Sequence, residues 1–389
     1  MSQLKDPAML TRLLSGALLL NPDVTTFWNM RRELMQTGRL DVQGELHFTA
    51  VLLSRKPKCA EAFAHRKWVV GRLLLAGVDV DELLEEELQV TQHAADRYPN
   101  NYHAWSHRMW CITHLAPSST APLLKEWATS ESWIQSHVSD HSGLQYRQFL
   151  LNSLLELKHP AVEEVADKTK KSLEQFLFSC EAIPLPSTKK DDILDIAQYF
   201  KVSAVMKFVP LLTSELMLNM DLIQRFTGHE ALWCHRRFLL TLFKKCLSCR
   251  GFDVNGTGVS RFNKVAPKNK FGDEKCAEVS LTFPLNYFMD DKEKGSENDA
   301  SQIGKCNNHK NMHGVPLEKD QKFSSDDLVG LDKKEREFYS YLHKVVMWHE
   351  AKLINSGRPD ELHQQRLAKQ HQKWLLHVLK VDMPAVACH

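Results

Sequence analysis

The sequence lacks the apolar stretches that place a chain in a membrane or mark it for secretion. None of its apolar runs approaches the roughly 18 residues that a membrane-spanning helix needs. The run 13–20 contains Gly16 and is followed by Asn21-Pro22-Asp23 instead of a small-residue cleavage site, so we predict a buried helix there. Nine cysteines without a secretion signal are typical of reduced thiols. We therefore expect a cytoplasmic protein without a transmembrane segment.

Several common chemical signatures are also missing. The net charge of +2 is too close to neutral to predict nucleic-acid binding. No glycine-rich phosphate loop appears, and the His-Glu pairs at 229–230 and 349–350 lack the second His of a zinc protease motif. A Cys-x-x-Cys pair (Cys246, Cys249) and a Cys-x-x-His pair (Cys306, His309) could together bind zinc, but residues 250–305 separate them. We predict no metal site in this chain.

The chain does contain one short phrase five times, a large apolar residue followed three places later by Arg. The copies are Trp28/Arg31, Phe63/Arg66, Trp105/Arg108, Leu144/Arg147 and Trp233/Arg236. The first four are 35, 42 and 39 residues apart, and the last gap is 89, which indicates one degenerate or interrupted copy. Such periods are typical of helix–turn–helix units that bury their apolar faces only by stacking on one another.

The spacing within the phrase indicates a structural role. Positions three apart share a helix face, so each Arg can stack on its aromatic neighbour and donate to carbonyls or carboxylates of the next repeat. His65, His107 and His235 each stand two places after the apolar position, and one His per repeat indicates packing instead of metal binding. Pro22, Pro57 and Pro99 precede the apolar position by six places, where proline can set a turn and open a helix.

Composition divides the chain into three parts. Residues 1–250 carry apolar residues at helical spacing and almost no strand-like alternation, so we predict an all-α solenoid of helical hairpins. Residues 251–330 hold eight of the sixteen glycines and no Trp, and we predict a disordered insertion. Helical patterning resumes at about 335–354 and 359–379, with Pro359 in the first turn of the last helix. We expect the helices of 331–383 to pack on the solenoid.

Two segments carry a family resemblance. Residues 101–110, Asn-Tyr-His-Ala-Trp-Ser-His-Arg-Met-Trp, resemble the repeat signature of protein prenyltransferase α subunits, as do residues 57–68. The resemblance covers about the first 250 residues. It is strongest to the divergent repeat-containing branch of the family, which carries a long insertion late in the chain.

The resemblance implies a crescent-shaped solenoid that wraps a separate β subunit. That β subunit holds the zinc, the thiolate and most of the isoprenoid pocket, so no cofactor is expected in this chain and an isoprenoid diphosphate is the co-substrate. The family's lysine near the leaving diphosphate falls on Lys58, and its neighbouring substrate-binding residues fall on Tyr102 and His103. An ammonium there would stabilise the negative charge of the departing diphosphate.

Departures from the family pattern refine the prediction. Cys59 and Ala60 replace the Asn and Tyr that follow the lysine, and Glu61 stands where farnesyl-type enzymes place a Gln near the substrate's terminal carboxylate. Because a Glu would repel that carboxylate, the resemblance favours a β subunit of the Rab geranylgeranyl type.

Three functions remain open from the sequence. The first is the α subunit of a protein geranylgeranyltransferase acting on substrate proteins with C-terminal cysteines. The second is a catalytically inactive scaffold, and the third a tetratricopeptide-like adaptor, which shares the period but not the Trp-x-x-Arg spacing.

Overall fold

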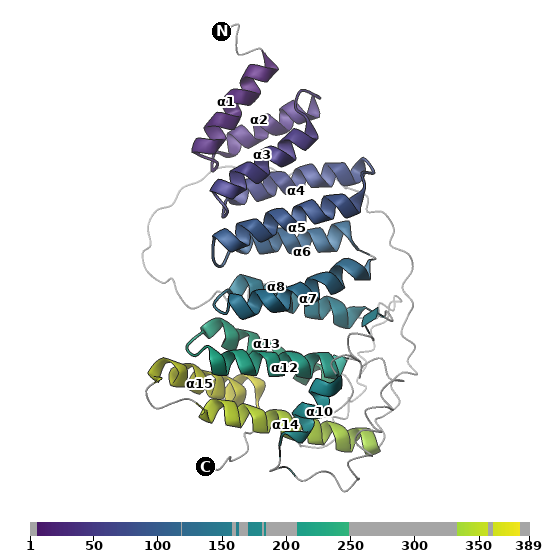
Figure 1. Ribbon diagram of the computed structural model, residues 1–389, viewed down its shortest axis with the longest axis vertical. Coiled ribbons are helices and arrows are strands. Elements are labelled where there is room, and N and C mark those ends of the chain that lie inside the picture. Colours follow the sequence, from purple (N-terminus) through teal and green to yellow (C-terminus); the bar gives the residue numbers. More distant parts are fainter. Residues whose placement is uncertain are drawn as a thin grey trace, which may run out of the picture. The chain divides into compact units, whose positions relative to one another are not determined.

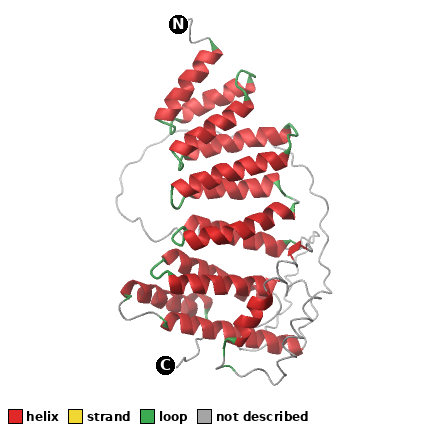
Figure 2. Cartoon of the chain, viewed as in Figure 1, coloured by secondary structure: helices red, strands yellow, loops and turns green. Residues whose placement is uncertain are grey.

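The computed structural model describes residues 6–117, 119–157, 161–162, 170–180, 183, 208–248, 333–356 and 361–381. The chain divides into one unit of Met1–Ser260 with Leu331–His389 and another of Arg261–Gly330. All of the second unit lies outside the described residues, as does the predicted insertion 251–330. Every regular element in the described part of the chain is a helix, as Figure 2 shows, so the predicted all-α class is confirmed.

Twelve of the described helices pair into six hairpins (Figure 1). Their bounds are α1 Pro7–Leu20 with α2 Thr25–Gln36, α3 Val42–Arg55 with α4 Ala60–Leu75, α5 Val80–Arg97 with α6 Tyr102–Leu115, α7 Thr120–Ser136 with α8 His141–Glu156, α12 Phe208–Arg225 with α13 Glu230–Ser248, and α14 Lys333–Asn355 with α15 Leu362–Trp374. A short helix, α10 (Lys170–Phe178), packs on α12, and a π-helical turn (Leu375–Leu379) extends α15. None of the described helices is long and apolar enough to cross a membrane.

Successive hairpins stack through their second helices. Helix α2 contacts α4, α4 contacts α6, α6 contacts α8, α8 contacts α13 and α13 contacts α15. Each hairpin therefore buries its apolar face against its neighbours, as a repeat solenoid requires. The apolar residue of the repeated phrase lies in this core, where all five copies are at most 4% exposed.

Side-chain caps begin α4, α6 and α8, and the caps of α4 and α6 follow predicted proline turns. The side chains of Asn101 and Asp140 accept backbone N–H groups in the first turns of α6 and α8. Pro57 and Pro99 each lie two residues before a cap, so they shape the turn but stand outside the helix. Pro359, expected in the first turn of the last helix, lies outside the described residues, and α15 begins at Leu362.

The arginine of each repeated phrase makes an ion pair with a buried glutamate from the first helix of the next hairpin. We call these pairs and their third partners the Arg–Glu ladder. The pairs are Arg31–Glu45, Arg66–Glu87, Arg108–Glu126, Arg147–Glu215 and Arg236–Glu350. Within each pair both residues are at most 6% exposed. The predicted donation from Arg to a carboxylate of the next repeat is thus confirmed.

Each glutamate of the ladder has a third partner, in the second helix of its own hairpin. The partners are His65, His107, Tyr146, His235 and His371, which contact Glu45, Glu87, Glu126, Glu215 and Glu350 at 2.8, 2.6, 2.5, 3.0 and 3.0 Å. The predicted packing role of the three repeated histidines is therefore correct, and the ladder adds a fourth histidine and a tyrosine. Each arginine also donates to a backbone carbonyl 20 residues earlier in the chain.

The ladder explains the long gap between the last two copies of the phrase. Arg147 of α8 bonds Glu215 of α12 at 2.7 Å, so the hairpin α12–α13 follows α7–α8 directly in the stack. The gap of 89 residues therefore reflects an insertion between two hairpins. The ladder ends at α14–α15, where Lys369 and Gln372 occupy the positions of the apolar residue and the arginine.

Candidate functional site

Lys58, the predicted catalytic residue, lies in the loop between α3 and α4. Its side chain is exposed, and its Nζ atom stands 4.7 Å from the centroid of the Tyr98 ring. Tyr98 is the C-cap residue of α5 in the next hairpin, and it is 45% exposed. The ammonium therefore rests on an aromatic face that comes from a neighbouring repeat.

Tyr102 and His103, the predicted substrate-binding residues, form the first turn of α6. Their ring centroids are 5.6 Å apart in an edge-to-face arrangement. Tyr102 is 48% exposed and His103 is half-buried. Burial, together with the nearby Lys58 ammonium, lowers the pKa of His103. Lys58, Tyr102 and His103 thus lie at one edge of the second and third hairpins, together with Tyr98.

Asn101 fixes the two loops of this edge to each other. Its Nδ2 atom donates to the carbonyl of Pro57 at 2.6 Å and to that of Ala94 at 3.1 Å, while its Oδ1 atom accepts the Ala104 N–H. Tyr98 precedes Pro99 and has the extended backbone that this position favours. The backbone beneath Lys58 and Tyr98 is therefore held by specific bonds.

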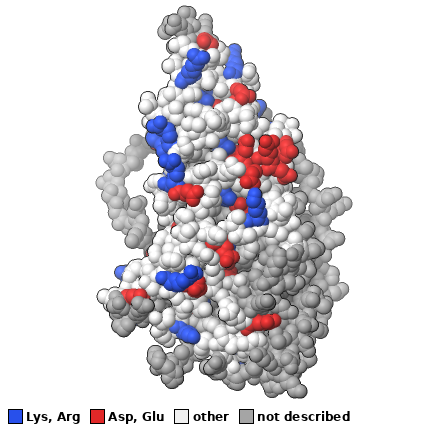
Figure 3. All heavy atoms as spheres, in the orientation of Figure 1, with Lys and Arg blue, Asp and Glu red and all other residues white. Residues whose placement is uncertain are grey.

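The Lys58 ammonium gives the site a positive charge, and the Glu61 carboxylate stands on the first turn of the following helix. Lys58 makes no ion pair with any residue that the structure describes. Figure 3 shows Lys and Arg side chains along the edge that carries the loops after α3 and α5, where Lys56, Lys58 and Arg97 are exposed, and acidic side chains over the start of α5. An exposed ammonium with hydroxyl and imidazole donors beside it suits a phosphate or diphosphate group.

Two of the three departures from the family pattern, Cys59 and Glu61, have local structural roles. The Cys59 side chain accepts the Ala62 N–H at 3.4 Å and so caps α4, which begins at Ala60. Glu61 is half-buried and accepts a hydrogen bond from the Thr25 hydroxyl of the first hairpin at 3.3 Å. Cys59 and Glu61 thus support the loop without adding a positive charge.

One group of described residues has the composition of a metal site. Glu87, His107 and Cys111 offer ligand atoms within 4.8 Å of one another, and all three are buried. Glu87 and His107 are nevertheless bonded to each other within the ladder, and Arg66 pairs with the same carboxylate. The positions equivalent to Cys111 are Val69, Leu150 and Leu239, so an apolar core residue is normal there. We interpret this group as packing.

The sequence also offers Cys246, Cys249, Cys306 and His309 as potential zinc ligands. Cys246 is half-buried in α13, but Cys249, Cys306 and His309 lie outside the described residues.

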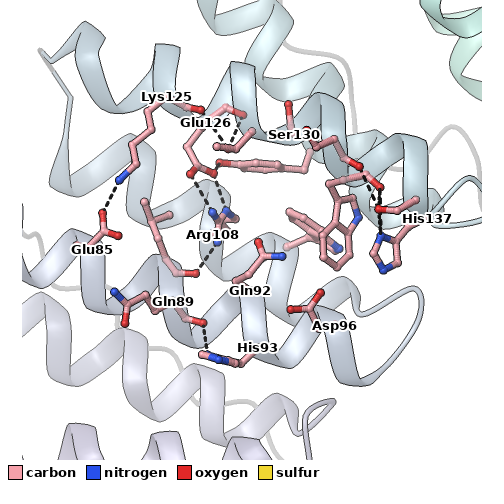
Figure 4. A pocket seen from close by; sticks show the side chains of 17 residues that line it. Glu85, Gln89, Gln92, His93, Asp96, Arg108, Lys125, Glu126, Ser130 and His137 are labelled. Carbon is pink, nitrogen blue, oxygen red and sulfur yellow. Dashed lines mark hydrogen bonds and ion pairs between the residues drawn. The ribbon is translucent and has the colours of Figure 1, made fainter.

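A hollow of about 510 Å³ opens between α5 and α7 (Figure 4). Its wall contains the third step of the ladder, Arg108, Glu126 and Tyr146, together with the ion pair of Lys125 and Glu85 at the rim. Lys58, Tyr102 and His103 do not line it. Its two cations, Arg108 and Lys125, are already paired with Glu126 and Glu85, so this hollow offers less free positive charge than the edge formed by Lys58, Tyr98, Tyr102 and His103.

Sequence reasoning missed two sets of residues. Tyr98 had one available signal, its place in the Tyr-Pro-Asn-Asn turn directly before α6. The ladder glutamates stand 20 or 21 residues before their His or Tyr partners, a constant spacing that a search for pairs could have found.

Comparison with known proteins agrees with this architecture. A family model described as the protein prenyltransferase alpha subunit repeat matches residues 42–73, 84–115 and 212–243. These segments correspond to the second, third and fifth hairpins. The first, fourth and sixth hairpins are not matched, although they contribute Arg31, Glu126, Arg147 and Glu350 to the same ladder.

Similar proteins cover most of the chain. Protein prenyltransferase alpha subunit repeat-containing protein 1-A of Xenopus laevis is 30% identical over 375 residues, which are 92% of this chain and 77% of the relative. The human repeat-containing protein 1 is 36% identical over 241 residues, 58% of this chain and 57% of the relative. Geranylgeranyl transferase type-2 subunit alpha of Sus scrofa is 31% identical over 153 residues, which are 36% of this chain and 25% of the relative. The chain belongs to the protein prenyltransferase alpha subunit repeat family.

Proposed function

We propose that this chain is the α subunit of a heterodimeric protein prenyltransferase that transfers a geranylgeranyl group to C-terminal cysteines of substrate proteins. The observation that carries the proposal is the meeting of Lys58, Tyr102 and His103 at one edge of the stack. Lys58 belongs to the second hairpin and the other two residues to the third, so the fold, not sequence adjacency, brings them together.

The chemistry assigns each residue a task. The thiolate sulfur of the substrate attacks C1 of the isoprenoid, a C–S bond forms, the C1–O bond breaks and diphosphate leaves with the electron pair. Lys58 places its ammonium where negative charge grows, and such preorganised charge stabilises the transition state more than the ground state. Tyr102 and His103 donate hydrogen bonds to the diphosphate. The zinc that activates the thiolate is expected in the partner β subunit.

The outer face of the second helices supports docking of such a partner. Three residues after each His or Tyr of the ladder stands an aromatic ring. Trp68, Trp110, Phe149 and Trp374 are half-buried, whereas the fifth ring, Phe238, is buried in the core. Cations lie over the first two rings, with Arg32 and Arg72 at Trp68 and Lys67 at Trp110, each between 5.0 and 5.7 Å from the ring centroid. A row of rings and cations is the composition of a protein interface centre.

We favour a β subunit of the Rab geranylgeranyl type, acting in the cytoplasm. The Glu61 carboxylate stands on the first turn of α4, directly after the Lys58 loop, and would repel the terminal carboxylate of a simple CaaX substrate. The partial similarity to a geranylgeranyl transferase type-2 subunit alpha supports the same partner class.

Co-expression with each type of β subunit, followed by a thiol prenylation assay, tests the proposal. Lys58→Ala should leave the heterodimer intact and reduce kcat roughly 10²- to 10³-fold, the usual effect of removing one preorganised charge donor. Lys56→Ala is the matched control, since Lys56 is an exposed lysine of the same loop. Equal activity of the Lys58→Ala variant and the wild-type protein would refute the catalytic role. Association with the farnesyl-type β subunit alone would refute the Rab-type assignment.

The scaffold function is the second candidate, and Cys59 and Glu61 favour it. Both are engaged in capping and inter-repeat bonds, as expected of a loop kept for stability alone. A scaffold should be soluble and monomeric when expressed alone and should associate with none of the β subunits. An obligate α subunit should behave poorly without its partner because its docking face is then exposed.

A further inference from the structure

The loop that carries Lys58 is one of five equivalent loops in the described part of the chain. The side chain at the Lys58 position contacts the next hairpin in three of them, and in a fourth the Gly228 N–H donates to Oε1 of Gln364 at 2.9 Å. The residue directly before the cap of each second helix is Asp23, Lys58, Asn100, Ser139 or Gly228. Asn100 accepts the backbone N–H of His141 at 2.7 Å, and the Ser139 hydroxyl lies 2.5 Å from Nδ1 of His229. Lys58 reaches across in the same direction but meets the ring of Tyr98.

The type of contact decides what the side chain can still bind. A hydrogen bond to the next hairpin uses a lone pair or a proton of Asn100 and Ser139. A cation–π contact uses none of the N–H donors of an ammonium and does not neutralise its charge. A carboxylate in the place of Tyr98 would hold Lys58 equally well, but it would compete with an incoming diphosphate.

Tyr98 is itself firmly placed. Pro99 restricts its backbone to the extended conformation, and Asn101 ties the following turn to the Pro57 carbonyl next to Lys58. The equivalent positions of the other described loops are Asn21, Lys56, His137 and Phe226. Phe226 also supplies a benzene ring, but the residue before the cap of the preceding loop is Ser139 there, so Tyr98 is the ring of this set that meets a lysine. A lysine side chain is otherwise flexible along its four-carbon stem.

We propose that Tyr98 is a positioning residue for anion binding, whose ring face holds the Lys58 ammonium at the site while leaving its charge and its donors free. The proposal rests on the proposed function, since it names the residue that prepares Lys58 for the diphosphate. The ring is the active part, and the hydroxyl is dispensable.

The affinity of the full-length chain for inorganic pyrophosphate, measured by calorimetry at low ionic strength, tests this assignment. Tyr98→Leu should weaken binding roughly two- to fivefold, the range expected from an exposed cation–π contact. Tyr98→Phe keeps the ring and should restore wild-type affinity. In the Lys58→Met background, Tyr98→Leu should have no further effect, because the ring acts only through the ammonium.

Three results would overturn the proposal. Wild-type affinity of the Tyr98→Leu variant would show that the ring does not position Lys58. A loss in Tyr98→Phe equal to that in Tyr98→Leu would assign the effect to the hydroxyl. An equal loss from Tyr98→Leu with and without Lys58 would show that the ring binds the anion by itself.

The failure of the proposed function gives a different pattern. If Lys58 is not part of an anion site, the Lys58→Met variant would bind pyrophosphate as tightly as the wild-type protein. The role of Tyr98 would then be refuted together with the anion site. Thermal unfolding followed by circular dichroism confirms that each variant is folded, and the exposure of both side chains favours this.

Discussion

The Arg–Glu ladder and the Lys58 edge use similar side chains for opposite purposes. Both combine a cation with imidazole or phenol groups, and the groups come from neighbouring hairpins. In the ladder a carboxylate completes each step and the whole set is buried. At the Lys58 edge no described carboxylate pairs with the ammonium, and the residues are exposed or half-buried. The comparison teaches that the missing carboxylate, not the presence of Lys and His, distinguishes a candidate anion site from structural packing in this fold.

Of the changes considered, acidification should lower the free energy of unfolding most, because it protonates the glutamates of the Arg–Glu ladder. Burial opposes ionisation of Glu215 and Glu350, but the paired arginine and histidine outweigh it and lower both pKa values to about 2, against an ordinary value of 4.5. A depressed carboxyl pKa contributes stability that is complete above the unfolded value and is lost as the pH falls towards the folded value. The free energy of unfolding should therefore drop steeply between pH 4.5 and about 2.

Two of the ladder histidines, His65 and His371, act in the same direction. Burial lowers the pKa of His371 below its ordinary 6.5 in spite of the adjacent Glu350, so the unfolded chain takes up its proton first and stability begins to fall below pH 6.5. Urea unfolding across this range measures the effect. Glu85→Gln is the control, because Glu85 pairs with Lys125 on the surface and its loss should leave the steepness unchanged. A flat profile down to about pH 3 would contradict a stabilising ladder.

Removing one carboxylate should break a single step of the ladder. Glu87→Ala leaves Arg66 and His107 buried without their shared partner, and an uncompensated buried charge costs about 3–5 kcal/mol of the free energy of unfolding. The half-exposed Glu86 is the matched control, and Glu86→Gln should change stability by less than about 0.5 kcal/mol. A double change, Arg66→Met with Glu87→Leu, should recover part of the loss. Equal stability of Glu87→Ala and the wild-type protein, measured in urea, would mean that the ladder is not stabilising.

The sequence allowed half of the ladder to be predicted. The arginines and three histidines follow a repeated phrase, because both sit at fixed places on the second helix. The glutamates do not stand at a fixed distance from the arginines, since the pairs are 14, 21, 18, 68 and 114 residues apart. Loops and insertions of different length separate the hairpins, so the pairing partner of an arginine is fixed by stacking and not by spacing.

The candidate site was less accessible to sequence reasoning. Lys58 is an exposed loop lysine that only the family resemblance singled out, and Tyr98 comes 40 positions later in another hairpin. A contact of two exposed side chains leaves no periodic pattern, whereas a buried ion pair recurs wherever hairpins stack. Buried residues recur along the sequence because every hairpin must pack on its neighbours. A binding residue in a loop is needed at one site and therefore leaves no repeated pattern.

The smallest change in stability is expected at Lys58. Lys58→Ala should change the free energy of unfolding by less than about 0.5 kcal/mol, because an exposed side chain over a half-exposed ring contributes little to stability. Arg66→Ala should cost about 3–5 kcal/mol, since it leaves Glu87 buried without its cation. If Lys58→Ala destabilised the chain as strongly as Arg66→Ala in urea, Lys58 would belong with the structural cations. A stable Lys58→Ala variant with lost prenylation would instead separate the two regions, because stability would then depend on the paired cations and activity on the unpaired one.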